Sequence, residues 1–200
     1  MSTDVEMSIE DSGGTNTQPL LVALPDTVHS IAMFLSNKVS AHDLKFQTTK
    51  NPKTRFHSSF PPQITIDQYL FYLMNNVRTC PAIIVYMLIY IERIISSLER
   101  KYQKQTKTNV PFLMTSYNAH RLVVTSFLLA HKYCEDYRYD TSRMAKIGGV
   151  HPKEMLKLER EFLKFIDFRL YVNEEEFTSY QNAVLMYGKA MVQQDQSQPA

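Results

Sequence analysis

The chain has 200 residues, of which 44% are hydrophobic and 21% are charged, a composition typical of one globular domain with a substantial core. Its formal net charge is only +2, which excludes an argument for nucleic-acid binding from overall charge alone. Two cysteines, Cys80 and Cys134, are too few for a disulfide framework. The reducing interior of a cell is therefore the expected compartment, whether cytoplasm, nucleus or both.

The N-terminal segment, residues 1–19, is polar and acidic, with four carboxylates and neither lysine nor arginine. It has little to bury, so it is predicted to be disordered, and it lacks the pattern of a secretory signal. The longest apolar run, Pro81–Ile91, is shorter than the roughly 20 residues that span a bilayer. We therefore expect no membrane association.

The first predicted helix begins after Pro25 and carries apolar residues at helical spacing, namely Val28, Ile31, Ala32, Leu35 and Val39. A loop is expected over residues 48–62. Five helical patterns then follow in close order, over residues 65–78, 81–103, 116–134, 140–147 and 151–166. The second of these is apolar all round in its first turns, which is typical of the central helix of a bundle.

Gly148 and Gly149 are predicted to end the fourth of these helices by adopting positive φ. A last helix is predicted from Glu174 to Tyr187, and the glutamine-rich tail, residues 188–200, is expected to be flexible. No segment alternates with period two. The predicted fold class is therefore all-α, a domain over residues 20–187 with five central helices and one extra helix on either side.

One charged side chain, Lys132, lies at the edge of an otherwise apolar helix face, as Glu159 does further along the chain. Lys132 follows Leu128 and Leu129, and Asp136 lies four residues later. A lysine in this position can extend along the apolar surface and pair with the aspartate of its own helix.

Glu159 is harder to explain within its own helix. Its neighbours one turn away include Met155, Phe162 and Leu163, and no lysine or arginine lies four residues away on either side. An unpaired carboxylate in such surroundings is costly, so it needs donors from elsewhere. These donors are either Lys132, which would make a structural bridge, or the backbone of a protein partner.

Several short motifs are specific in combination, and they are His120-Arg121-Leu122, Thr125-Ser126, Ala130-x-Lys132, Asp136, Ala145-Lys146-x-Gly148-Gly149, Leu158-Glu159-x-x-Phe162-Leu163 and Glu176-Phe177-Thr178-Ser179-Tyr180. With them, the chain from about Leu20 to Tyr180 resembles the cyclin family, and within it the small P/U-type cyclins that include the phosphate-pathway cyclins of fungi. Only about 30 residues follow the fifth central helix, too few for a second five-helix repeat. The resemblance therefore implies a single cyclin box.

The resemblance implies a regulatory subunit, not an enzyme, that binds and activates a cyclin-dependent protein kinase as a heterodimer without a cofactor. In that family the residues that match Lys132 and Glu159 both reach the kinase around its regulatory helix. The apolar contacts that flank them fall here on Leu129, Tyr133, Leu163, Phe168 and Leu170.

The chain also departs from the family pattern. Residues 139–144 lack the asparagine and the second aromatic residue usual before Ala-Lys-x-Gly-Gly. The first helix of the box lacks the Met-Arg-Ala-Ile-Leu docking motif of mitotic and S-phase cyclins. Substrate recruitment through that patch is therefore not expected.

Two other classes of function compete with this interpretation. A cyclin-fold adaptor in transcription could bind DNA or another protein through a basic stretch, which comprises Arg93, Arg100, Lys101, Lys104 and Lys107. A solvated helix end explains this stretch better, because transcription factors with this fold usually carry two repeats. An enzyme is disfavoured by the absence of a glycine-rich phosphate loop, Gly-x-Ser-x-Gly and His-Glu-x-x-His. His131 and Cys134 could form half of a metal site, but no second pair at zinc spacing accompanies them.

Overall fold

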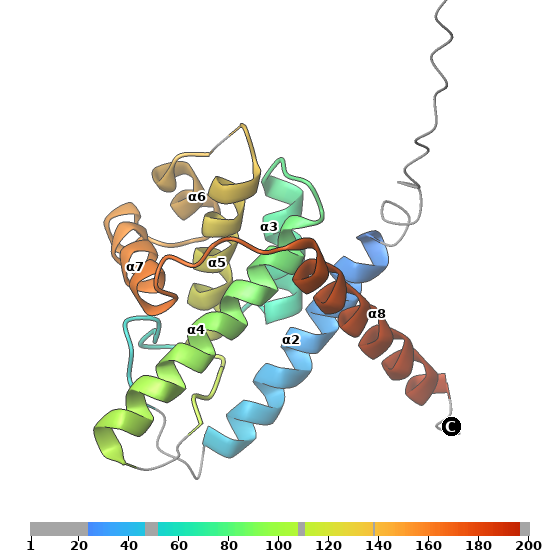
Figure 1. Ribbon diagram of the computed structural model, residues 1–200, viewed down its shortest axis with the longest axis horizontal. Helices are drawn as coiled ribbons and strands as arrows, with labels where there is room; N and C mark the ends of the chain where they lie inside the picture. Colours follow the sequence, from blue (N-terminus) through green and yellow to red (C-terminus); the bar gives the residue numbers. More distant parts are fainter. Residues whose placement is uncertain (1–23, 47–51, 108–110, 138, 197–200) are drawn as a thin grey trace, which may run out of the picture.

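The computed structural model describes residues 24–46, 52–107, 111–137 and 139–196. Within these ranges the chain forms seven α-helices and no strand, which confirms the all-α prediction. The helices are α2 (Leu24–Phe46), α3 (Ile66–Asn76), α4 (Ile83–Thr106), α5 (Ala119–Cys134), α6 (Thr141–Ile147), α7 (Pro152–Phe165) and α8 (Glu174–Gln196) (Figure 1). The acidic segment 1–19 lies outside the described residues.

Helix α4 is the central helix, as its apolar first turns predict. Its buried residues occupy nearly every position from Ile83 to Ile91 and continue to Leu98. The most extensive helix contact of the described residues is between α4 and α5, while α3 and α7 pack against α5 and the short α6 packs against α7. Helices α3 to α7 form the five-helix box, and α2 and α8 flank it (Figure 1).

The last helix is longer than the sequence predicts. The pattern places its end at Tyr187, but α8 continues to Gln196 through the first part of the expected tail (Figure 1). Gly188 is buried, and a β-carbon added there would collide with Ser30 of α2. Packing of α8 on α2 therefore stabilises the helix through a glycine that helix propensity alone disfavours.

The two glycines after α6 have different roles, which corrects the prediction that both supply positive φ. Gly149 has φ +66°, but Gly148 has φ −75°. A β-carbon at Gly148 would collide with the side chain of Val124 in α5, and the Gly148 carbonyl accepts a hydrogen bond of 2.7 Å from Tyr69 Oη. Gly148 is therefore required for the close approach of α6 to α5.

The described part of the predicted loop, from residue 52 onwards, is irregular but anchored to the box. Phe56 is fully buried and meets Phe162 of α7 edge to face, with ring centroids 5.9 Å apart. Arg121 of α5 donates from Nη1 to the carbonyl oxygens of Arg55 at 3.2 Å and His57 at 3.0 Å. These contacts hold the segment beside α7.

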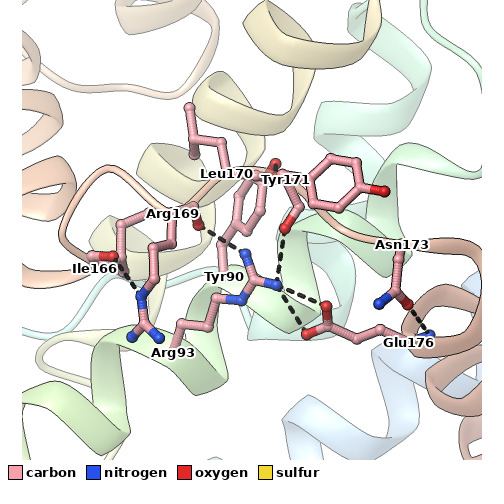
Figure 2. Close-up of polar contacts among 8 residues, drawn as sticks. All are labelled: Tyr90, Arg93, Ile166, Arg169, Leu170, Tyr171, Asn173 and Glu176. Atoms are coloured by element: carbon pink, nitrogen blue, oxygen red, sulfur yellow. Dashed lines mark hydrogen bonds and ion pairs between the residues drawn. The ribbon is translucent and has the colours of Figure 1, made fainter.

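The connection between α7 and α8 is fastened to α4 by Arg93 (Figure 2). Its guanidinium donates to the carbonyl oxygens of Arg169 at 2.7 Å and Tyr171 at 3.0 Å, and to both carboxylate oxygens of Glu176 at 2.8 Å. Tyr90 Oη donates to the carbonyl oxygen of residue 170 at 2.7 Å. Arg93, which the sequence places in a basic stretch, is thus committed to the fold and not available to DNA.

Candidate functional site

Three helices meet at the end of α5, where Lys132, Thr141 and Glu159 lie together. Lys132 is in the last turn of α5, Thr141 is the first residue of α6, and Glu159 is in the middle of α7. Lys132 Nζ lies 2.5 Å from Glu159 Oε1 and donates to Thr141 Oγ1 at 2.7 Å. Thr141 Oγ1 in turn donates to Glu159 Oε2 at 3.2 Å. Each of the three groups contacts the other two.

This contact identifies Lys132 as a donor to Glu159, one of the two sources that the sequence leaves open. The expected pairing of Lys132 with Asp136 is not among the ion pairs of the described residues. The two side chains remain 32% and 14% exposed, so the bridge lies at the surface. An ammonium group has three protons, and the contacts with Glu159 and Thr141 use two of them.

Thr141 is a site residue that the sequence analysis missed. The sequence predicts only that Asp140 or Thr141 begins a helix, and Asp140 proves to be the cap, since its Oδ1 accepts from the Arg143 amide at 2.6 Å. The Thr141 hydroxyl is then left to reach α5 and α7. A hydroxyl after a capping residue is common to many helices, so it was not a specific signal.

Four apolar residues follow the two charged residues in the sequence and are defined here as the apolar rim, namely Tyr133, Leu163, Phe168 and Leu170. Tyr133 follows Lys132 and is 45% exposed, and Leu163 lies one turn after the glutamate in α7. Phe168 is 65% exposed, while Leu163 and Leu170 are half-buried against the core. The rim therefore presents two aromatic side chains to solvent over a partly apolar base.

Leu129 does not belong to this rim. It is only 2% exposed and is part of the hydrophobic core, because α5 lies between α4 and α7 and Leu129 turns inward. It offers almost no surface to a partner in this conformation. Its contribution is to hold α5 in place beneath Lys132.

The turn after α7 determines how Phe168 is exposed. The amide of Phe168 donates to the Leu163 carbonyl at 2.9 Å, and that of Asp167 donates to the Lys164 carbonyl at 3.3 Å. This is the Schellman arrangement that closes helix ends, usually with glycine at its left-handed position. Here Asp167 and Phe168 both adopt left-handed backbone, with φ 54° and 55°.

Neither metal binding nor membrane insertion is supported within the described ranges. They contain no group of three or more His, Cys, Asp and Glu side chains arranged to hold a metal ion. His131 is fully buried with its ring edge-to-face on Tyr139, at 5.3 Å between centroids, whereas Cys134 is an exposed free cysteine. The proposed half-site is therefore split between core and surface. No described helix combines the length and apolar character needed to cross a bilayer.

A helical bundle with exposed aromatic side chains beside a half-buried ion pair has features of a protein-docking module, because aromatic side chains are enriched in interfaces. Comparison with protein families matches the cyclin family over residues 19–170. The chain belongs to the cyclin family, and its five-helix box with two flanking helices is the fold expected of a single cyclin box.

Similar proteins from plants and fungi fall in the P/U-type and PHO85 groups of cyclins. The chain is 29% identical to Cyclin-U2-2 of Arabidopsis thaliana over 162 residues, 81% of this chain and 66% of that protein. It is 32% identical to PHO85 cyclin-7 of Saccharomyces cerevisiae over 136 residues, or 68% and 48%. It is 30% identical to Cyclin-P3-1 of Oryza sativa subsp. japonica over 176 residues, or 87% and 67%. The chain thus spans about half to two thirds of the length of these curated relatives.

Proposed function

We propose that this chain is a regulatory subunit that binds and activates a cyclin-dependent kinase of the PHO85 type. The observation that carries the proposal is the position of the Lys132–Glu159 ion pair, half-buried at the surface of a cyclin box and flanked by the apolar rim. A protein of this kind acts inside the cell, where its kinase is found. The kinase would contact Lys132, Glu159 and the four rim residues, with Thr141 positioning the ion pair.

The mechanism follows from a conformational equilibrium in the kinase. A free cyclin-dependent kinase holds its regulatory helix outward, so the glutamate of that helix cannot pair with the lysine that orients ATP. A subunit that binds the helix-in state more tightly shifts this equilibrium. Shifting it from 1:99 to 99:1 takes roughly 5.5 kcal/mol of differential affinity.

Burial of the apolar rim is the main source of this free energy, since apolar surface contributes about 25 cal/mol for each Å² removed from water. The ion pair adds specificity more than affinity. Its charges fix the register of the two proteins and disfavour partners that lack complementary groups. The internal bridge holds Lys132 and Glu159 in place before the kinase arrives, which reduces the entropy lost on binding.

Charge reversal tests this proposal. Lys132→Glu or Glu159→Lys places two like charges together and should lower the melting temperature of the isolated chain, and the double reversal should restore it. Kinase binding should fall in all three variants, because the kinase groups remain unchanged. The expected loss is about 2–5 kcal/mol, roughly 30- to 4,000-fold in affinity. Calorimetric titration of a PHO85-type kinase, with thermal melting in parallel, measures both effects.

The matched control is Glu154→Lys, which breaks another ion pair of α7, the 3.0 Å contact with Arg121. Its kinase affinity should stay within about twofold of the parent, as is usual for exposed ion pairs away from an interface. Kinase binding recovered by the double reversal would show that the pair is only an internal strut. Phosphate transfer from ATP by the pure chain would contradict the regulatory role itself.

A further inference from the structure

A basic groove lies on the side of α7 opposite Glu159 and its ion pair with Lys132. It has a volume of about 670 Å³ and is lined by the C-terminal half of α4, by α7 and by the segment before α3. These three elements lie side by side in Figure 1. Its lining consists of Arg55, Ser97, Lys101, Lys157, Arg160, Glu161, Lys164 and Phe165.

Five of these eight residues are basic and one is acidic, so the groove carries a net charge of +4. The whole chain carries +2 and residues 1–19 contribute −4, so residues 20–200 carry +6, of which the groove holds +4. Like charges gathered in a concave surface raise the local potential and attract anions. Such crowding is unfavourable in the free protein and is relieved when an anion binds.

The chain neutralises little of this charge itself. Glu161 pairs with Arg55 at 2.7 Å, and Lys101 Nζ lies 4.8 Å from the ring centroid of Phe165. Three exposed cations on α7, Lys157, Arg160 and Lys164, have no ion pair within the described part of the chain. They lie three to four residues apart, so they share one helix face.

We propose that this groove binds a phosphorylated segment of a partner protein, with a phosphoserine or phosphothreonine among acidic residues. A phosphate carries close to two negative charges and three strong acceptor oxygens, which suits a cluster of lysine and arginine donors. Arg160 can meet two phosphate oxygens at once, while Lys157 and Lys164 act as point charges beside it. Glu161 is paired with Arg55 and so leaves the donors of Lys157, Arg160 and Lys164 free.

The groove suits a peptide better than a nucleic acid. Its one aromatic lining residue is Phe165, and the Lys101 ammonium covers one face of this ring, so that face is not available for base stacking. On α4, Arg93 is bound within the fold and Arg100 Nε donates to the Ser96 carbonyl, while Lys104 and Lys107 extend the positive charge beyond the groove. Duplex DNA is therefore included as a competitor in the test.

The experiment measures binding of a fluorescent serine-containing acidic peptide to the full chain, with and without phosphate on the serine. We expect the phosphopeptide to bind at least about tenfold more tightly, with affinity falling as salt increases. The double variant Lys157→Gln with Arg160→Gln should weaken phosphopeptide binding by about tenfold or more. The matched control, Lys153→Gln with Lys189→Gln, removes the same charge from exposed positions outside the groove and should change it by less than about twofold.

Four results would overturn the proposal. Equal losses in the two double variants would mean that only net charge matters, and equal binding of the two peptides would mean that phosphate is not recognised. Duplex DNA binding more tightly than the phosphopeptide, and lost in the groove variant, would assign the groove to nucleic acid. A chain lacking residues 1–19 that gained about tenfold in affinity would identify this acidic segment as the occupant. The inference does not rest on kinase binding, because the isolated chain is used throughout.

Discussion

Phe168 carries its exposed ring on a backbone that few residues adopt. A left-handed conformation costs a non-glycine residue about 1–2 kcal/mol, and here Asp167 and Phe168 adopt it in succession. The hydrogen bonds to the Leu163 and Lys164 carbonyls hold this turn. Strained backbone of this kind is often found at binding sites, which agrees with the proposed role of the ring in kinase docking.

Truncation of the Phe168 side chain should weaken kinase binding and leave folding nearly unchanged. Phe168→Ala removes a side chain that is 65% exposed, so the melting temperature should change little. Kinase affinity should fall by about 30-fold, the effect of losing an aromatic anchor worth about 2 kcal/mol. Tyr171→Ala is the control, because this ring is 71% exposed but lies outside the rim. A similar loss of kinase affinity in both variants would contradict a specific role for Phe168.

At this scale the sequence singles out Lys132 and Glu159 and names Lys132 as one possible donor to Glu159, but it does not reveal Thr141. Lys132 and Glu159 stand out because each interrupts an apolar helix face, and this depends only on residues one turn away. Thr141 joins them through contacts 9 and 18 residues along the chain. Those contacts depend on the angle at which α6 leaves α5, and no local pattern specifies it. The burial of Leu129 depends in the same way on how α5 packs.

At the scale of elements, α2 and α8 depend on each other for their positions. Phe34 of α2 meets Tyr187 of α8 edge to face, with centroids 5.4 Å apart, and Asn37 Nδ2 donates to Tyr187 Oη at 2.9 Å. Gly188 follows directly and allows the two helices to approach at Ser30. The periodic apolar pattern predicts both helices. Gly188 suggests that the second helix ends at Tyr187, because the role of this glycine in packing is not visible in the sequence.

The variant Gly188→Ala tests whether Gly188 is needed for close packing of α8 on α2. Its effect on stability has one sign if packing dominates and the opposite sign if helix propensity dominates. In a solvent-exposed helix, alanine in place of glycine stabilises by about 1 kcal/mol through propensity. In the close α2–α8 contact the added methyl group collides with Ser30, and overpacking of this kind costs about 1–3 kcal/mol. We therefore expect a lower free energy of unfolding, measured by urea denaturation. A stabilised variant would show that α8 does not pack closely on α2 at this position.

At the scale of the whole molecule, the basic groove is a feature that the sequence alone does not reveal. Its cations come from three parts of the chain, around Arg55, Lys101 and Lys157, and these parts are more than 40 residues apart in the sequence. The sequence draws attention instead to the basic run at the end of α4, of which Arg93 is internal to the fold and only Lys101 lines the groove. Charge counted along the chain therefore does not reveal which cations share one surface.

Buried and half-buried histidines distributed across the domain make its stability depend on pH. Burial lowers the pKa of four histidines below the ordinary value of 6.5, and they are His42, His57, His120 and His131. Hydrogen bonds with backbone groups oppose this effect at each of them without reversing it. In the unfolded chain the same rings titrate near 6.5, so just below this pH the unfolded state binds more protons than the folded state.

Stability should therefore decrease as the pH falls through about 6.5, and continue to decrease until the folded-state pKa values are reached. Urea denaturation at about pH 7.5 and at about pH 5.5 should show a lower free energy of unfolding at the acidic value. His131→Phe should reduce this difference, because it removes one titrating ring while keeping an aromatic contact with Tyr139. Glu135 faces His131 and favours the charged form of its ring. The pKa of the Glu135 carboxylate is itself lowered below 4.5, so this group does not titrate between the two pH values compared. Equal stability at the two pH values, or greater stability at the acidic one, would contradict the lowered pKa values of these histidines in the folded state.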